Sequence, residues 1–171
     1  MVITGRYASP LGGITLASDG TALSGLWFDG QKYFGGTLKG GYVEREVPVF
    51  CQVRRWLDKY FSGKAPDFLP PLAMEGASPF RKTVWEILLS IPFGSTLTYG
   101  LIAARMQSET GKRVSAQAVG GAVGHNPISV IIPCHRVVGS DGSLTGYAGG
   151  LDKKLNLLKL EGADVSGFRF K

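Results

Sequence analysis

Residues 131–138 have the sequence Ile-Ile-Pro-Cys-His-Arg-Val-Val. Ile128 to Ile132 is a β-branched, apolar run that predicts a buried strand, and Pro133 ends it because proline cannot donate to a ladder. We therefore expect Cys134 to lie where a buried strand gives way to a loop.

Cys134 has a base and a cation as its sequence neighbours, His135 and Arg136. A free thiol has a pKa of about 8.5, so little reactive thiolate is present at neutral pH without such help. Adjacent residues of a strand point to opposite faces, so His135 can act on Cys134 only if the chain turns at Pro133, or through a bridging water. The alternative is an inert, buried cysteine beside surface charges.

Length and composition indicate a folded protein of one domain or two small lobes, because the 171 residues are 44% apolar. The first six residues do not show the basic segment followed by an apolar region that is typical of a signal peptide. No apolar run reaches the length of about 18 residues that a membrane span needs. We expect an intracellular protein, cytoplasmic or, in a eukaryote, nuclear, with no membrane partner. Its two cysteines need no disulfide, and Cys51 is expected in a helix core.

Charge is unevenly distributed along the chain. Residues 1–78 hold 8 basic and 7 acidic side chains, whereas residues 79–171 hold 11 and 6, so the net charges are +1 and +5. The excess of positive charge therefore lies in the part of the chain that contains Cys134. This is the distribution expected if that part meets a polyanion such as DNA.

Residues 1–75 are predicted to form a small α/β lobe. Alternating apolar residues predict strands over 3–7, 14–17 and 22–28, with a hairpin turn at Ser18-Asp19-Gly20. Apolar residues at helical spacing, with Pro48 in the first turn and Gly63 as the stop, predict a helix over 48–61. The segment from Pro70 to Ala77 is typical of a linker.

Residues 76–171 are predicted to form a mostly helical lobe. Ser78 caps a helix that stops at Pro92, and Leu151 to Leu160 forms the last helix. Two short helices, 99–106 and 116–123, flank a polar turn and predict a helix-turn-helix, a DNA-binding motif. The second of them contains Gly120 and Gly121, each costing about 1 kcal/mol relative to alanine. A close approach of this helix to a packed neighbour or to the floor of a DNA groove would compensate for the lost helix stability.

A family resemblance rests on residues 126–138, Asn-Pro-Ile-Ser-Val-Ile-Ile-Pro-Cys-His-Arg-Val-Val, followed by Gly-Tyr-Ala-Gly-Gly at 146–150. These motifs resemble those of the O6-alkylguanine-DNA alkyltransferases, in order from about Ser78 to Gly162 and more loosely in the amino-terminal part. The resemblance implies a ribonuclease-H-like α/β lobe and a helix-turn-helix lobe. It also implies irreversible, stoichiometric transfer of the alkyl group of O6-alkylguanine, and of O4-alkylthymine, in DNA to Cys134.

The resemblance also assigns roles to individual residues. Glu161 would orient His135, which takes the Cys134 proton through a water, while Tyr99 donates toward N3 of the guanine and Asn126 holds the active-site loop. Substrate-binding residues implied by the resemblance are Val137, Tyr147 and Ala148. DNA-binding residues implied by it are Gln117, Gly100, Lys112, Ala118, Gly121, Arg136 and Ser140.

Two positions depart from the family pattern. Gln117 replaces an arginine that enters the base stack, so weaker affinity for duplex DNA is expected. Ala148 replaces serine but keeps the backbone N–H, so its contact with the base should survive. The small residues Gly149 and Gly150 suggest room for groups larger than methyl.

The expected partner is double-stranded DNA bearing a flipped O6-alkylguanine, bound by a monomer through the minor groove. No cofactor and no metal are predicted, because the amino-terminal region offers only Cys51 as a zinc ligand. His125 is expected to be a loop residue or a phosphate contact. Two rival functions are a lesion sensor without chemistry, which the presence of Cys134 disfavours, and a cysteine hydrolase, which would need an oxyanion site.

Overall fold

The structure is a computed structural model that describes residues 1–38, 40–74 and 76–170. Its contacts divide the chain into two compact units. The first comprises Met1–Gly76 and Pro127–Ser129, and the second comprises Ala77–Asn126 and Val130–Lys171. The predicted α/β class is confirmed, with a sheet in the first unit and most helices in the second.

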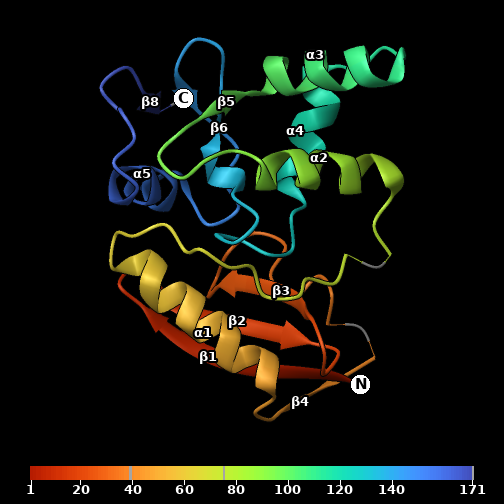
Figure 1. The fold of residues 1–171 in the computed structure, drawn as a ribbon, viewed down its shortest axis with the longest axis vertical. Coiled ribbons are helices and arrows are strands. Elements are labelled where there is room, and N and C mark those ends of the chain that lie inside the picture. The colour runs from red at the N-terminus through yellow and green to blue at the C-terminus, as the bar shows by residue number, and fades with distance from the viewer. Residues whose placement is uncertain (39, 75, 171) are drawn as a thin grey trace. The chain divides into compact units, whose positions relative to one another are not determined.

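The first unit contains a four-stranded sheet in the order β3-β2-β1-β4 (Figure 1). Its strands are β1 (Val2–Ser9), β2 (Gly12–Ser18), β3 (Leu23–Phe28) and β4 (Tyr42–Glu44). Strands β1, β2 and β3 pair antiparallel, as their alternating pattern predicts, and the Asp19 carboxylate closes the β2–β3 turn by accepting from the N–H groups of Thr21 and Ala22. Edge strand β4 was not predicted, because its three residues are exposed and show no alternation.

Helix α1 (Pro48–Phe61) lies across one face of this sheet (Figure 1). Its bounds agree with the prediction. The buried residues of its inner stripe are Val49, Phe50, Val53, Trp56, Leu57 and Tyr60. The expectation that Cys51 is a core residue is wrong: Cys51 is exposed, because it shares the outer face of the helix with Arg55 and Asp58.

The described residues of the second unit form four α-helices and several short strands. Its helices are α2 (Pro79–Leu89), α3 (Tyr99–Thr110), α4 (Ala116–Gly124) and α5 (Leu151–Leu160), with a 3-10 helix η1 (Cys134–Arg136). Its strands are β5 (Leu97–Thr98), β6 (Val137–Val138), β7 (Ser143–Leu144) and β8 (Arg169–Phe170). Within this unit, α3 and α4 form the predicted helix-turn-helix. Among the described residues, no helix combines the length and the apolar content that a membrane span requires.

Side-chain caps begin three of these helices. The hydroxyls of Ser78, Thr98 and Ser115 each accept from the backbone N–H three residues later, at 3.1–3.2 Å. Such caps satisfy donors that the first helical turn leaves without partners. Helix α3 continues past the predicted end at residue 106 and stops at Gly111, whose φ of 70° is left-handed.

The buried strand predicted over residues 128–132 does not form. Ile128 makes one isolated bridge to Leu26, and Val130 has a φ of 70°, which no strand residue can adopt. Both residues are nonetheless fully buried. The apolar run therefore indicates burial correctly, but the chain passes through this region as turns.

Candidate active site

Cys134 begins the 3-10 helix η1, so the chain turns immediately after Pro133, as required for His135 to share a site with the thiol. The thiol is buried, with 6% of the residue exposed. Asn126 holds the approach to this turn, since its Nδ2 donates to the Ile132 carbonyl at 2.8 Å, and its side chain also hydrogen-bonds Cys134. A single buried amide thereby fixes both the loop and the sulfur.

His135 and Glu161 form a buried pair. The His135 Nε2 atom donates to Glu161 Oε2 at 2.5 Å, and neither side chain is exposed. Because Nε2 carries its hydrogen toward the carboxylate, Nδ1 is the ring nitrogen left to accept a proton. Tyr147 packs its ring edge-on against the imidazole, with the centroids 6.5 Å apart. The pair has the form of an oriented general base.

Glu161 is held from several sides. Arg136 donates from Nε to Oε1 at 2.8 Å and from Nη2 to Oε2 at 3.1 Å, and its Nη1 donates to the Ile91 carbonyl at 2.7 Å. The Gly94 N–H also donates to Glu161 Oε1 at 3.0 Å. Gly94 has a φ of 84°, and a Cβ there would lie 3.0 Å from the Glu161 carbonyl oxygen, so a side chain at this position would be strained.

Arg136 is therefore placed differently from the other predicted DNA-binding residues. It is 8% exposed and its donors are directed to Glu161 and Ile91. Gly100, Lys112, Gln117, Ala118, Gly121 and Ser140 are all exposed. The geometry gives Arg136 a role inside the site, and a DNA contact by this residue stays a prediction that its burial disfavours.

The site favours a neutral starting state for both the thiol and the base. Burial raises the pKa of the Cys134 thiol, although the Asn126 hydrogen bond and the positive charge of Lys154 act in the opposite direction. Burial likewise lowers the pKa of His135, against the effect of its bond to Glu161. A neutral thiol is thus followed in the sequence by a neutral imidazole, and these are the protonation states from which a base can take the thiol proton.

Glu161 is expected to make folding stability sensitive to acid. Burial alone would raise its pKa, but hydrogen bonds from His135 and Arg136 and their charges lower it from 4.5 to about 2. A carboxylate with a lowered folded pKa contributes stability above about pH 4.5, here about 3 kcal/mol, and loses it as the pH falls through about 2. In urea unfolding experiments at pH 2–6, the free energies of unfolding of the native protein and of Glu161→Gln should approach each other as the pH falls. A pH-independent difference would contradict this.

Tyr99 and Lys154 complete the surroundings of the thiol. The Tyr99 hydroxyl donates to the Thr145 carbonyl at 3.1 Å, and Lys154 Nζ donates to the same oxygen at 2.9 Å. Burial raises the pKa of Tyr99, so its hydroxyl keeps its proton until a stronger acceptor arrives. The other predicted base contacts, Val137 and Ala148, lie in the same unit, Val137 buried and Ala148 half-buried.

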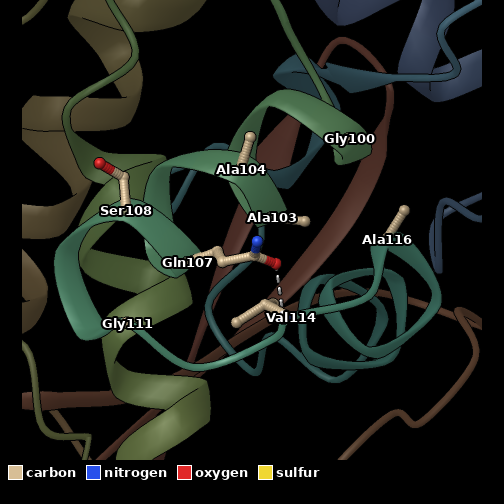
Figure 2. Close-up of a pocket in the computed structure, with 8 residues that line it drawn as sticks. All are labelled: Gly100, Ala103, Ala104, Gln107, Ser108, Gly111, Val114 and Ala116. Carbon is tan, nitrogen blue, oxygen red and sulfur yellow. Dashed lines mark hydrogen bonds between the residues drawn. The ribbon is translucent and has the colours of Figure 1, made fainter.

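The helix-turn-helix presents a small-residue surface. A hollow of about 640 Å³ lies between α3 and the start of α4, lined by Gly100, Ala103, Ala104, Gln107, Ser108, Gly111, Val114 and Ala116. Figure 2 shows Gln107 of α3 reaching to the Val114 N–H, a hydrogen bond of 3.3 Å that ties α3 to the turn before α4. His125 ends α4 with its Nδ1 atom 2.7 Å from the Gly121 carbonyl oxygen.

The two central glycines of α4, Gly120 and Gly121, face different surroundings. A Cβ on Gly120 would lie 3.8 Å from the Tyr99 ring, an ordinary contact, whereas a Cβ on Gly121 would meet nothing within 4 Å. Internal packing can therefore explain a glycine at position 120, but it does not explain the glycine at position 121. Gly121 leaves an open strip of helix backbone on the exposed face.

Sequence reasoning missed two members of the site. Lys154 is buried among the inward residues of α5, and Gly94 binds Glu161 through its backbone. A signal for Lys154 was present: it lies three residues after Leu151 and four before Leu158, on the apolar stripe of the helix, where a lysine is out of place. Backbone donors such as Gly94 leave no comparable sequence signal.

Comparison with known proteins agrees with this architecture. Residues 2–74 match the "6-O-methylguanine DNA methyltransferase, ribonuclease-like domain" family model, and residues 79–163 match the "6-O-methylguanine DNA methyltransferase, DNA binding domain" model. Methylated-DNA–protein-cysteine methyltransferases of Haemophilus influenzae and Methanosarcina barkeri are 41% and 47% identical. The first alignment covers 91% of this chain and 83% of the relative, the second 90% and 92%.

Solved structures are similar over nearly the whole chain. OGT of Mycobacterium tuberculosis in complex with DNA has a TM-score of 0.79 at 39% identity, covering 94% of this chain and 91% of that one. An O6-methylguanine DNA methyltransferase of Methanococcus jannaschii has a TM-score of 0.64 at 31% identity, covering 98% of both.

A buried thiol beside an oriented histidine, in the same unit as a helix-turn-helix, defines a DNA-binding protein equipped for chemistry at its own cysteine. The matches to both family models cover most of the sequence, and the curated relatives share more than 40% of their aligned residues with it. The chain belongs to the 6-O-methylguanine DNA methyltransferase family.

Proposed function

We propose that this protein repairs DNA directly, by moving the alkyl group of O6-alkylguanine, and of O4-alkylthymine, onto Cys134. The observation that carries the proposal is the buried His135–Glu161 pair, joined at 2.5 Å and adjacent to the thiol, in a chain of this family. The relatives' names, methylated-DNA–protein-cysteine methyltransferase, support the same chemistry.

The reaction is a single displacement. His135, held by Glu161, takes the Cys134 proton through a water, and the thiolate sulfur attacks the alkyl carbon. The bond from that carbon to O6 breaks, its electron pair stays with the guanine, and the Tyr99 hydroxyl donates a proton toward N3. A thioether remains on the protein, and because water does not hydrolyse a thioether, each chain reacts once.

Tyr99 must exchange partners for this step. Its hydroxyl donates to the Thr145 carbonyl at 3.1 Å, so a bound guanine would compete with that oxygen for the same hydrogen. Val137 and Ala148 would read the base edge through their backbones, and Tyr147 would line the pocket while keeping the His135 ring in place. The alkylated base reaches the site by flipping out of the duplex.

DNA is proposed to bind the helix-turn-helix face through its minor groove, to a monomeric and cytoplasmic protein. Five of the predicted contacts are exposed there, and Gly121 leaves helix backbone open for close approach; Ser140 is exposed in the loop between β6 and β7. The complex of the Mycobacterium tuberculosis relative with DNA supports the partner. The net charge of +5 beyond residue 78 favours a polyanion.

Gln117→Arg is expected to strengthen binding to duplex DNA about 3–10-fold. Gln117 is exposed on α4, and a guanidinium there would add charge and a stacking surface in place of the flipped base. Fluorescence anisotropy with an O6-methylguanine duplex at two salt concentrations measures the change. Asn156→Arg, at an exposed position of α5 outside the helix-turn-helix, is the control for added charge alone, and an unchanged or lower affinity of Gln117→Arg would contradict the prediction.

The proposed function is tested by intact-mass measurement after incubation with an O6-methylguanine oligonucleotide. One added methylene per chain, located on the peptide that contains Cys134 and absent from the exposed Cys51, is the expected result. An unmodified oligonucleotide serves as the control. Binding without any mass gain would instead indicate a lesion sensor, and turnover of an ester substrate would indicate a hydrolase.

A further inference from the structure

Lys154 is a buried cation that the reaction described so far does not use. It lies on the inner face of α5 with 1% of its surface exposed, among leucines. Lysine is almost never fully buried unless its charge has a purpose or a partner, because leaving water disfavours the ammonium. Burial accordingly lowers the pKa of Lys154 to about 8, against the opposite effect of charge on Cys134.

The ammonium shares an acceptor with Tyr99. Lys154 Nζ and the Tyr99 hydroxyl both donate to the Thr145 carbonyl, at 2.9 and 3.1 Å, and Nζ lies 6.0 Å from the centroid of the Tyr99 ring. A carbonyl oxygen has two lone pairs and can accept both bonds. When the Tyr99 hydroxyl turns to a bound base, the Lys154 bond keeps this buried oxygen satisfied and the loop in place.

Lys154 also acts electrostatically on the thiol. Its positive charge lowers the pKa of Cys134, and negative charge on Cys134 raises that of Lys154, so the two groups favour each other's ionised forms. Elements packed against α5 are η1, which brings Cys134, His135 and Arg136, and β7, which brings no titratable group. Tyr99 faces it from α3.

We propose that Lys154 is a positioning residue for alkyl transfer: as an ammonium it anchors the Thr145 carbonyl that seats Tyr99, and it stabilises the negative charge that develops on Cys134 as the proton leaves. This inference rests on the proposed transfer to Cys134. In this proposal, the Lys154 cation of α5 assists thiolate formation in addition to the general base formed by His135 and Glu161.

The first test measures the thiol without DNA. In a Cys51→Ser background, the rate of iodoacetamide alkylation between pH 6 and 10 reports the thiolate fraction of Cys134. Lys154→Met and Lys154→Gln should lower this rate at neutral pH about tenfold, which corresponds to one unit of thiol pKa. Lys154→Arg should restore it, because arginine keeps its charge over this range. Lys159→Met, exposed on the same helix, is the matched control.

The second test measures single-turnover methyl transfer from an O6-methylguanine oligonucleotide across the same pH range. The two neutral variants should be slower at pH 7 by a similar factor, with melting temperatures that show they are folded. Native rates in either folded neutral variant would overturn the proposal, and so would a folded Lys154→Arg as slow as Lys154→Met. If the native protein takes no methyl group from DNA, the proposed function fails, whereas the iodoacetamide profiles still decide the role of Lys154.

Discussion

Cys134→Ala is expected to abolish methyl transfer completely while leaving binding to an O6-methylguanine duplex intact. The sulfur is the proposed acceptor of the alkyl group, and it lies at the start of η1, next in sequence to His135 of the His135–Glu161 pair. Alanine fills most of the same volume, so the free energy of unfolding should change by only about 1 kcal/mol. Intact-mass measurement reports transfer, and fluorescence anisotropy reports binding.

The matched control is Cys51→Ala. Cys51 is exposed on the outer face of α1, and the variant should transfer methyl groups at the native rate. Residual transfer by Cys134→Ala, or a methyl group mapped to another residue, would contradict the assignment of the acceptor. Loss of DNA binding together with transfer would show that the cysteine also supports the binding surface.

Glu161→Gln is expected to slow methyl transfer by about 10²–10⁴-fold, the range that general-base catalysis contributes. The amide can still occupy the space of the carboxylate, but it carries no charge to stabilise the imidazolium formed when His135 takes the thiol proton. Arg136 also loses its counter-ion while 8% exposed. An uncompensated buried charge costs about 3–5 kcal/mol, so the variant should also unfold at lower urea concentration.

Glu109→Gln provides the control for loss of a carboxylate in an ion pair. Glu109 pairs with Arg105 on the surface of α3, four residues apart, and 55% of its side chain is exposed. Such pairs contribute about 0.3–0.5 kcal/mol, so transfer and unfolding should remain close to native. A fully active Glu161→Gln at a temperature where it is folded would contradict the role of Glu161 in orienting the base.

Local chemistry made much of this fold predictable from the sequence. The caps Ser78, Thr98 and Ser115 act within three residues of their own position, and the apolar stripe of α1 repeats at the period of the helix. The bounds of α1 and α5 were predicted to the residue for the same reason. Such features need no knowledge of distant parts of the chain.

Features that depend on distant contacts were not predictable. Residues 128–132 are as apolar as a buried strand, but the left-handed Val130 and the Asn126 bond to the Ile132 carbonyl hold them as turns. The DNA contact that the resemblance implies for Arg136 stays a prediction. Its bonds to Glu161 and Ile91 left no sign in the sequence, because both partners lie far from it in the chain. Only the folded chain shows that its charge is used within the site.

The return of Pro127–Ser129 to the first unit has a consequence for folding. The Leu26 N–H donates to the Pro127 carbonyl, and the Ser129 N–H donates to the Leu26 carbonyl, which joins segments from opposite halves of the chain. Contacts between such distant segments close large loops and form slowly. The chain passes between its two units three times, so synthesis must continue beyond Ser129 before the sheet edge at β3 can acquire its last partner.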